Sequence, residues 1–137
     1  MRLFVDSSAL TKRYVREKGT DAVIEIFSKA GAIYVSQICL PEIFSALNRS
    51  KRTHLINHIQ YIELKANVLK DFTHFNICQL TPHVISKTVL LLEQHSLRTM
   101  DAIHLASALE LQIDLFVSAD IRQITAAKAS KIKTLRI

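Results

Sequence analysis

The 137-residue sequence has few of the residues that mark loops, cross-links or membrane spans: two glycines, two prolines, two cysteines and no tryptophan. So few glycines and prolines indicate short connections without linkers or low-complexity segments. Cys39 and Cys78 lie in apolar surroundings, so we expect free buried thiols in a reducing cytoplasm rather than a disulfide or a zinc site. No apolar run is long enough to span a bilayer, and Asp6 interrupts the apolar start too early for a signal peptide. These absences predict a cytoplasmic protein that does not enter the membrane.

The sequence is rich in apolar residues and in positive charge. Hydrophobic residues make up 49% of the chain, and 18 Lys and Arg against 12 Asp and Glu give a net charge of +6. The length is sufficient for one domain with its own core. The apolar content favours a further surface buried against a partner, and the charge favours contact with a polyanion or an acidic protein.

Short apolar segments alternate with helical patterns along the chain. Strands are expected at residues 2–5, 32–36, 76–80 and 113–120, with an edge strand at 131–137. Helices are expected at residues 7–17, 21–30, 39–51, 55–75, 81–96, 100–111 and 121–130. This order predicts an α/β fold with a mostly parallel sheet that is covered on both faces. Right-handed crossovers place the carboxyl ends of parallel strands at one edge, where such folds bind ligands.

Three acidic residues follow the predicted strands. Asp6 comes after the first strand, Glu42 lies in the first turn of the helix after the second, and Asp120 stands at the carboxyl end of the fourth. Asp101 opens a nearly all-apolar helix, and topology does not predict its location because another helix precedes it. Each acid has a simpler explanation as a helix cap, a role that stabilises by about 0.3–1 kcal/mol.

The acids taken together weaken that simpler explanation. Two carboxylates about 4 Å apart repel by about 4 kcal/mol at an effective dielectric constant near 20. Helix dipoles do not offset several such pairs. Either the acids are spread apart, or a divalent cation lies among them, and acidic oxygen ligands suit Mg²⁺ or Mn²⁺.

Four segments resemble the PIN domain, and most closely the VapC-like toxins of type II toxin–antitoxin pairs: FVDSSALTKRYVRE, LPEIFSALNR, LRTMDAIHLASAL and LFVSADIRQITAA. They cover nearly the whole chain in the family's order. The resemblance implies one PIN-like domain over residues 1–137, a three-layer α/β/α sandwich. It also implies a metal-dependent endoribonuclease with one or two Mg²⁺ or Mn²⁺ ions, an RNA substrate, an antitoxin partner and a homodimer.

The resemblance assigns roles to particular side chains. The family's four acidic positions fall on Asp6, Glu42, Asp101 and Asp120. We expect Asp6 and Asp101 to hold the principal ion, and Glu42 and Asp120 to orient bound water or hold a second ion. The family's small hydroxyl residues fall on Ser7 or Ser8 and on Ser118, which would support the ligands or simply cap helices.

Other residues receive less specific expectations. Two basic clusters are candidates for contact with the RNA backbone, namely Lys12, Arg13, Arg16 and Lys18, and Arg49, Lys51, Arg52 and His54. A solvated helix face also explains either cluster, and Lys12 and Arg13 are expected to lie nearer the acidic site. His104 is expected to be a buried, hydrogen-bonded core histidine rather than a ligand or a base. The amphipathic helix at 55–75 is expected to contribute to the dimer or antitoxin interface. Its apolar face carries Leu55, Ile59, Ile62, Ala66, Leu69 and Phe72.

Two alternatives stay open. The first is a PIN-fold module that binds a partner without catalysis, which four intact acids argue against. The second is a nuclease that acts on DNA, which the small size disfavours because the chain has no room for an added arch or clamp. A phosphoryl-receiver domain fits poorly, since Thr81 and Pro82 follow the third strand where that fold needs an acceptor Asp.

Overall fold

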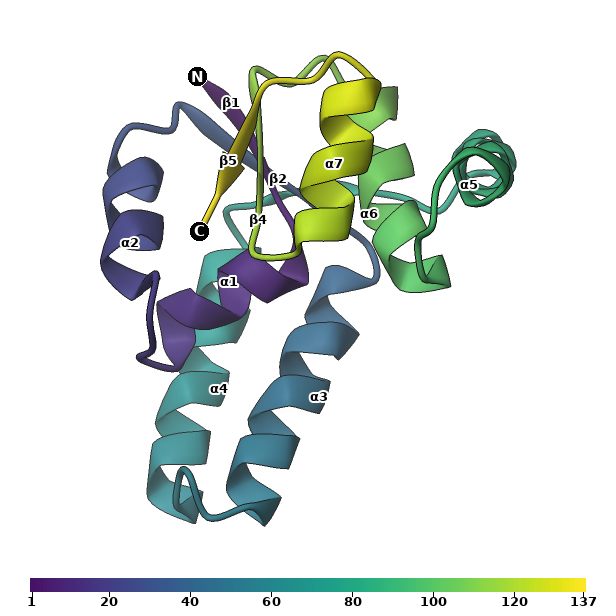
Figure 1. Ribbon diagram of the computed structural model, residues 1–137. Helices are drawn as coiled ribbons and strands as arrows, with labels where there is room; N and C mark the ends of the chain where they lie inside the picture. The colour runs from purple at the N-terminus through teal and green to yellow at the C-terminus, as the bar shows by residue number, and fades with distance from the viewer.

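The computed structural model describes all 137 residues, and its centre is a five-stranded sheet whose strands are all parallel (Figure 1). The spatial order is β3-β2-β1-β4-β5. The strands are β1 (Arg2–Val5), β2 (Ala32–Ser36), β3 (Asn76–Cys78), β4 (Leu115–Ser118) and β5 (Thr134–Arg136). The chain therefore reverses its direction of travel across the sheet at β1, which has β2 on one side and β4 on the other. In such sheets the ligand crevice lies at this switch point, beyond the carboxyl ends of the strands.

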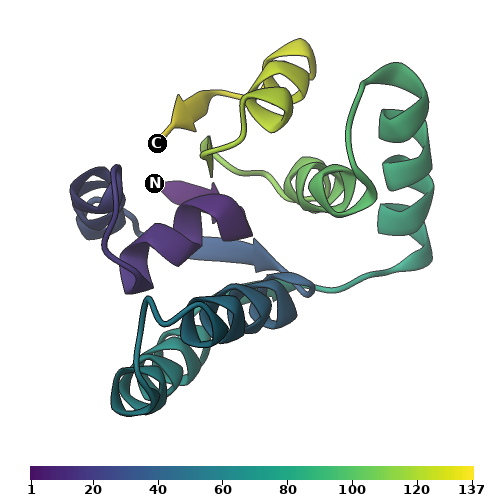
Figure 2. The same ribbon diagram turned by 60° about the horizontal axis from the view of Figure 1, so that its bottom comes forward.

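Seven helices cover the two faces of this sheet. They are α1 (Ser7–Tyr14), α2 (Thr20–Ser28), α3 (Cys39–Arg52), α4 (His58–Phe72), α5 (Pro82–Gln94), α6 (Thr99–Glu110) and α7 (Ile121–Ala129). One core cluster joins the sheet to α1, α3 and α4, and the other joins it to α5, α6 and α7. Figure 2 shows α3 and α4 side by side on one side of the molecule and α5 beyond α6 on the other. This arrangement confirms the predicted α/β fold with helices on both faces.

The central strand shows why the sheet must be covered twice. Side chains alternate between the two faces of a strand. Phe4 lies in the core cluster with α6, whereas Leu3 and Val5 lie in the cluster with α1 and α3, and all three are fully buried. Phe4 stacks on Phe116 of β4, with ring centroids 5.7 Å apart. A strand that is buried on both faces has the uninterrupted apolar sequence of a parallel sheet.

The predicted helix bounds differ most from the structure in two helices, where local polar contacts end or start the helix. The first helix ends at Tyr14 rather than at residue 17, since Thr20 Oγ1 donates to the carbonyl oxygen of Lys12 at 2.7 Å and satisfies the last turn. The helix predicted at 55–75 begins at His58, because Asn57 and Gln60 form a reciprocal capping box.

The apolar face predicted for the helix at 55–75 lies mostly in solvent. Leu55 is 67% exposed and Ile59 70% exposed, and Ile62 and Leu69 are also exposed. The core contacts of α4 come from another set of side chains, namely Tyr61, Leu64, Val68 and Phe72. We call Leu55, which precedes α4, together with Ile59, Ile62 and Leu69 of α4, the α4 strip. None of the helices combines the length and the apolar character that a membrane crossing requires.

Candidate functional site

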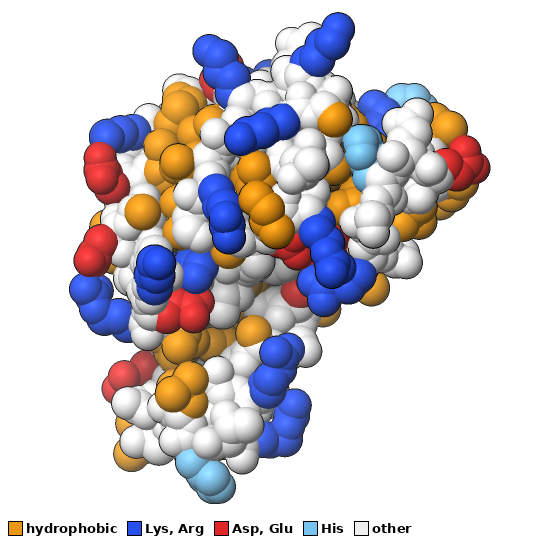
Figure 3. Space-filling model, in the orientation of Figure 1, with side chains coloured by type: hydrophobic (Ala, Val, Ile, Leu, Met, Phe, Trp, Pro, Cys, Tyr) orange, Lys and Arg blue, Asp and Glu red, His pale blue; other side chains and the backbone are white.

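A polar cleft of about 470 Å³ opens at the carboxyl edge of the sheet and is lined by all four predicted acids. Asp6 follows β1 at the start of α1, and Asp120 follows β4 at the start of α7. Glu42 lies in the first turn of α3, and Asp101 lies in the first turn of α6. Four helix starts therefore converge on one cleft. Figure 3 shows acidic atoms recessed beneath Lys and Arg side chains on this face.

Asp6 is the most buried of the acids. Its carboxylate accepts hydrogen bonds from the amide of Ala9 at 2.9 Å, from Ser118 Oγ at 2.7 Å and from Gln123 Nε2 at 2.7 Å. Ser8 Oγ also donates to both of its oxygens. Burial raises the pKa of Asp6, and the nearby His104 and these hydrogen bonds offset only part of that rise. No Lys or Arg side chain pairs with Asp6, so the chain itself does not neutralise this buried carboxylate.

Asp101 is linked to Asp6 by one neutral donor. Gln123 Nε2, which donates to Asp6, also donates to Asp101 Oδ1 at 3.2 Å. Gln123 is buried on α7, and Asp101 begins the run of eight buried residues in α6. A single amide nitrogen therefore brings together oxygens of two predicted ligands. The helix order gave no indication of this proximity, and the structure supplies it by packing α6 against α7.

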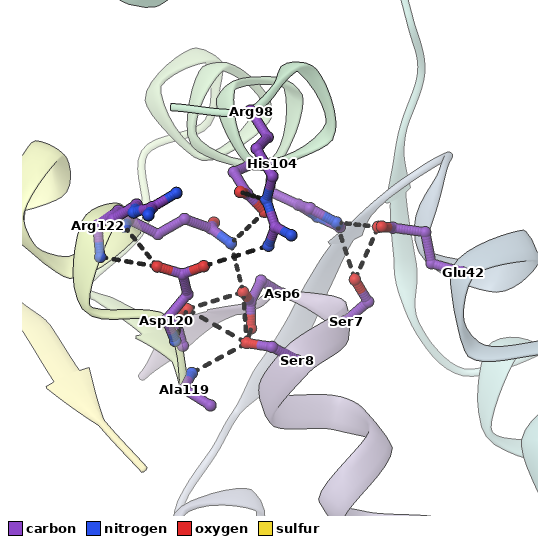
Figure 4. Close-up of polar contacts among 12 residues, drawn as sticks. Asp6, Ser7, Ser8, Glu42, Arg98, His104, Ala119, Asp120 and Arg122 are labelled. Atoms are coloured by element: carbon purple, nitrogen blue, oxygen red, sulfur yellow. Dashed lines mark hydrogen bonds and ion pairs between the residues drawn. The ribbon is translucent and has the colours of Figure 1, made fainter. Parts of the chain in front are cut away.

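Asp101 and Asp120 share a cation from the chain itself. Arg98 Nε donates to Asp101 Oδ2 at 2.9 Å, and Arg98 Nη2 lies 3.5 Å from Asp120 Oδ2. Figure 4 shows the guanidinium between α6 and the start of α7. Asp120 also caps α7 by accepting the amide of Arg122 at 2.7 Å. The cap explanation is thus correct for Asp120, and it coexists with the position of this residue in the cleft.

Glu42 lies on the opposite side of the cleft from Asp120 (Figure 4). Its Oε1 accepts from Ser7 Oγ at 2.7 Å and lies 2.5 Å from His104 Nε2. Burial alone would raise the pKa of Glu42, but the hydrogen bond and charge of His104, together with Ser7, lower it overall. His104 is buried and hydrogen-bonded as expected, and its partner is one of the four acids.

The three predicted serines support the acids. Ser7 donates to Glu42, while Ser8 and Ser118 both donate to Asp6 and lie 3.4 Å from each other. Ser8 Oγ further accepts the amide of Ala119, so it ties the start of α1 to the end of β4. These contacts connect the carboxylates to the strand ends that carry them.

The structure does not bring Lys12 and Arg13 into the cleft. Lys12 Nζ donates to the carbonyl oxygen of Lys18 at 2.9 Å, and Arg13 Nε pairs with Asp71 at 2.8 Å. Neither residue lines the cleft, although the preceding Thr11 does, and α1 packs against α2, α3 and α4. They serve intramolecular contacts, and their predicted role in RNA contact has no support from this placement.

The predicted site residues did not include three long polar side chains that line the cleft, Arg49, Arg98 and Gln123, although Arg49 belonged to a basic cluster considered for RNA contact. Two of them had a pattern that could have identified them. Arg98 lies three residues before Asp101, a spacing at which helical side chains pair, and Arg49 lies two turns after Glu42 on the same face of α3. Gln123 had no such pattern, because a glutamine on a short helix is ordinarily solvent-exposed.

The chemistry of the site suits a divalent cation, with one rearrangement. The donors are carboxylate oxygens, which Mg²⁺ and Mn²⁺ prefer, and Asp6 is a buried carboxylate without a paired cation. No group of three His, Cys, Asp or Glu side chains is arranged to hold a metal ion in this structure. Asp101 and Asp120 instead face the guanidinium of Arg98. An ion shared by these acids therefore requires Arg98 to release them.

Known proteins resemble this chain in sequence and in fold. The family model of the PIN domain matches residues 3–129. Ribonuclease VapC45 of Mycobacterium tuberculosis is 27% identical over 107 residues, which cover 78% of this chain and 74% of the relative.

Solved structures share the whole architecture at low sequence identity. VapC20 of Mycobacterium tuberculosis, a sarcin-ricin loop cleaving toxin, matches 98% of this chain and 99% of its own, with a TM-score of 0.73 and 16% identity. VapBC2 of Rickettsia felis, solved with a DNA fragment from its promoter, matches 100% of this chain and 99% of its own, with a TM-score of 0.71 and 13% identity. Together with the family match, these likenesses establish that the chain belongs to the PIN domain family, as a distant homologue of the VapC ribonuclease toxins.

Proposed function

We propose that this protein is a Mg²⁺- or Mn²⁺-dependent endoribonuclease, and that it is the toxin of a toxin–antitoxin pair. The observation that carries the proposal is the convergence of Asp6, Glu42, Asp101 and Asp120 on one cleft of a PIN fold. Distant relationship to VapC ribonucleases supports RNA as the substrate. Hydrogen bonds hold each acid, so the cleft is preorganised rather than assembled from mobile loops.

The four acids divide into two pairs in this proposal. Asp6 and Asp101, which share the amide of Gln123, would hold the principal ion. Glu42 and Asp120 would orient water or hold a second ion. A bound divalent ion would activate water and neutralise charge on the scissile phosphate.

The remaining cleft residues position these groups and the substrate. His104 and Ser7 fix the Glu42 carboxylate, while Ser8 and Ser118 fix Asp6. Arg49 on α3 provides positive charge at the cleft for an RNA phosphate.

A protein partner is part of the same proposal. Similar solved structures include a toxin–antitoxin complex from Klebsiella pneumoniae and VapBC2 of Rickettsia felis, which favours an antitoxin for this chain. The exposed α4 strip offers an apolar surface for an antitoxin or for a second copy in a homodimer. A short open reading frame directly upstream of the gene would identify the antitoxin candidate.

The test gives the purified chain two substrates, total RNA from its host and a DNA of matched sequence, and measures cleavage of each. Wild type with Mg²⁺ or Mn²⁺ should cut RNA, and EDTA should abolish cleavage. Asp6→Asn and Asp101→Asn should lose at least about a hundredfold in rate, because metal-ligand charge is removed. Glu63→Gln, which removes an exposed carboxylate on α4, should cut normally.

The outcomes separate the alternatives. Wild-type protein that cuts neither nucleic acid would contradict the enzyme and favour a partner-binding module. Preferential cleavage of DNA would show that DNA, and not RNA, is the substrate. Equal activity in Asp6→Asn and wild type would exclude this cleft as the active site.

A further inference from the structure

Arg98 occupies the position of a cation between two of the predicted ligands. Its Nε lies 2.9 Å from Asp101 Oδ2, and its Nη2 lies 3.5 Å from Asp120 Oδ2. A guanidinium and a divalent ion are both attracted by these oxygens and repel each other at this distance. The two cations therefore compete for the same carboxylates.

The side chain of Arg98 is free to leave while its backbone stays anchored. The carbonyl oxygen of Arg98 accepts the amide of Ala102 at 3.0 Å, which fixes the residue as the N-cap of α6. In contrast, 73% of the side chain is exposed, and its only polar contacts are the two aspartates. Because the guanidinium stays largely in water while its carboxylate partners are mostly buried, the arginine can leave the pair for solvent, and a divalent ion can displace it.

A released guanidinium would remain in the cleft beside a second unpaired arginine. Arg49 lines the same cleft from α3 and has no carboxylate partner. Two guanidinium groups on either side of an acidic cleft fit a phosphodiester, which accepts bidentate hydrogen bonds from arginine.

We propose that Arg98 is an exchangeable side chain, which bridges Asp101 and Asp120 in the ion-free protein and binds a substrate phosphate once a divalent ion has taken its place. The exchange would couple the two binding events, because the ion releases the group that receives the phosphate. This inference rests on the proposed function, since it assumes a divalent ion and a nucleic-acid substrate at the cleft.

The first experiment measures Mn²⁺ binding to the ion-free protein by calorimetry. Arg98→Ala removes the competitor and should tighten Mn²⁺ binding about twofold to tenfold. Arg98→Lys should bind Mn²⁺ with an affinity between those of wild type and Arg98→Ala, because one ammonium does not bridge two carboxylates as a guanidinium does. Arg122→Ala is the matched control, since it removes an exposed arginine of α7 whose side chain has no partner in the cleft. An equal change in Arg98→Ala and Arg122→Ala would overturn the exchange.

The second experiment measures binding of a 12-nucleotide RNA by fluorescence anisotropy in Ca²⁺, with intact RNA confirmed on a denaturing gel. Arg98→Ala should weaken binding about threefold to tenfold and reduce the salt slope by about one. Arg98→Ala should thus bind the metal ion more tightly than wild type and bind RNA more weakly. A damaged fold would weaken both, and unchanged RNA binding would overturn the phosphate contact.

The third experiment follows the Nε–H resonance of Arg98 in ¹⁵N-labelled protein, assigned by its loss in Arg98→Lys. Addition of Mg²⁺ should shift this resonance, and an unmoved signal at saturating Mg²⁺ would overturn the release.

The exchange of Arg98 and the proposed function would be contradicted by different results. If wild type binds Mn²⁺ and cuts RNA, and Arg98→Ala behaves identically, only the exchange is excluded. If wild type neither binds Mn²⁺ nor cuts RNA, the proposed function is excluded as well.

Discussion

His104 Nε2 lies 2.5 Å from Glu42 Oε1, although the two residues are 62 positions apart in the sequence. His104 is only 1% exposed and belongs to the apolar helix that also carries Asp101 in its first turn. One buried helix therefore presents Asp101 directly and holds Glu42 through His104. A carboxylate oxygen only accepts hydrogen bonds, so Nε2 is the donor in this pair.

Replacement of His104 should separate positioning from packing. His104→Leu fills the space without a donor and leaves Glu42 with Ser7 alone, which should cost about 1–3 kcal/mol of stability. His104→Gln provides an amide donor and should restore most of the stability and activity. The check is thermal unfolding together with RNA cleavage, and equal behaviour of the two variants would contradict a role for the hydrogen bond.

His104→Leu should also change how stability and RNA cleavage depend on pH, in a direction that the pKa of Glu42 determines. His104 and Ser7 lower the pKa of Glu42 against the opposing effect of burial. The stability from this depressed pKa is present above the ordinary Glu range and is lost as pH falls through the lowered value. In His104→Leu burial should dominate, so the pKa of Glu42 should rise and the acid limb of the cleavage profile should move to higher pH. ¹³C NMR titration of the Glu42 carboxylate provides a direct measurement.

Asp6→Asn should stabilise the ion-free protein at neutral pH. Burial raises the pKa of Asp6, so its ionisation opposes folding, and the penalty grows as pH rises from the ordinary value of 3.8 through the raised one. Asn removes the charge, and the unfolding temperature at pH 7.5 should rise by about 2–6 °C. The difference should shrink as pH approaches 3.8. Mg²⁺ should stabilise wild type but not the variant, and a variant that gains as much from Mg²⁺ would contradict metal binding at Asp6.

Arg49 and Arg13 should respond differently to neutralisation. Arg49→Gln removes an exposed cleft cation and should weaken RNA binding about threefold to tenfold, with unchanged stability. Arg13→Gln breaks the pair with Asp71 and the contact over the Phe27 ring, so it should lower stability by about 0.5–2 kcal/mol and leave RNA binding within about twofold. Anisotropy and chemical denaturation of both variants give the comparison, and the reverse pattern would restore Arg13 as the RNA contact.

The α4 strip should matter for association rather than for folding. Ile59→Ser with Ile62→Ser replaces exposed side chains, so the free energy of unfolding should change by less than about 1 kcal/mol. Self-association measured by light scattering, or binding of the antitoxin, should weaken by at least about tenfold. Ile85→Ser, an exposed apolar change on α5, is the comparison variant. If the double variant associates normally with itself and with the antitoxin, the strip is not an interface.

Periodicity and residue type were sufficient to predict the layered fold and most of the candidate site. The apolar strands separated by helices require a parallel sheet buried on both faces, and parallel strands end at one edge. Asp6, Glu42 and Asp120 follow such strands, so their convergence is a consequence of chain order. The likeness of LRTMDAIHLASAL to the PIN family added Asp101, which chain order alone did not place.

The contacts between side chains needed the folded chain. Gln123 meets Asp6 from 117 residues away, and Ser7 meets Glu42 from 35 residues away. Such contacts depend on how far each helix is rotated about its axis when it packs, and an apolar pattern specifies this rotation only loosely. For the same reason α4 buries Val68 and exposes Ile59, and α1 turns Lys12 and Arg13 away from the cleft. Chain order thus explains why Asp6, Glu42 and Asp120 meet, whereas helix packing explains why Asp101 joins them and which neutral and positive groups hold the four acids.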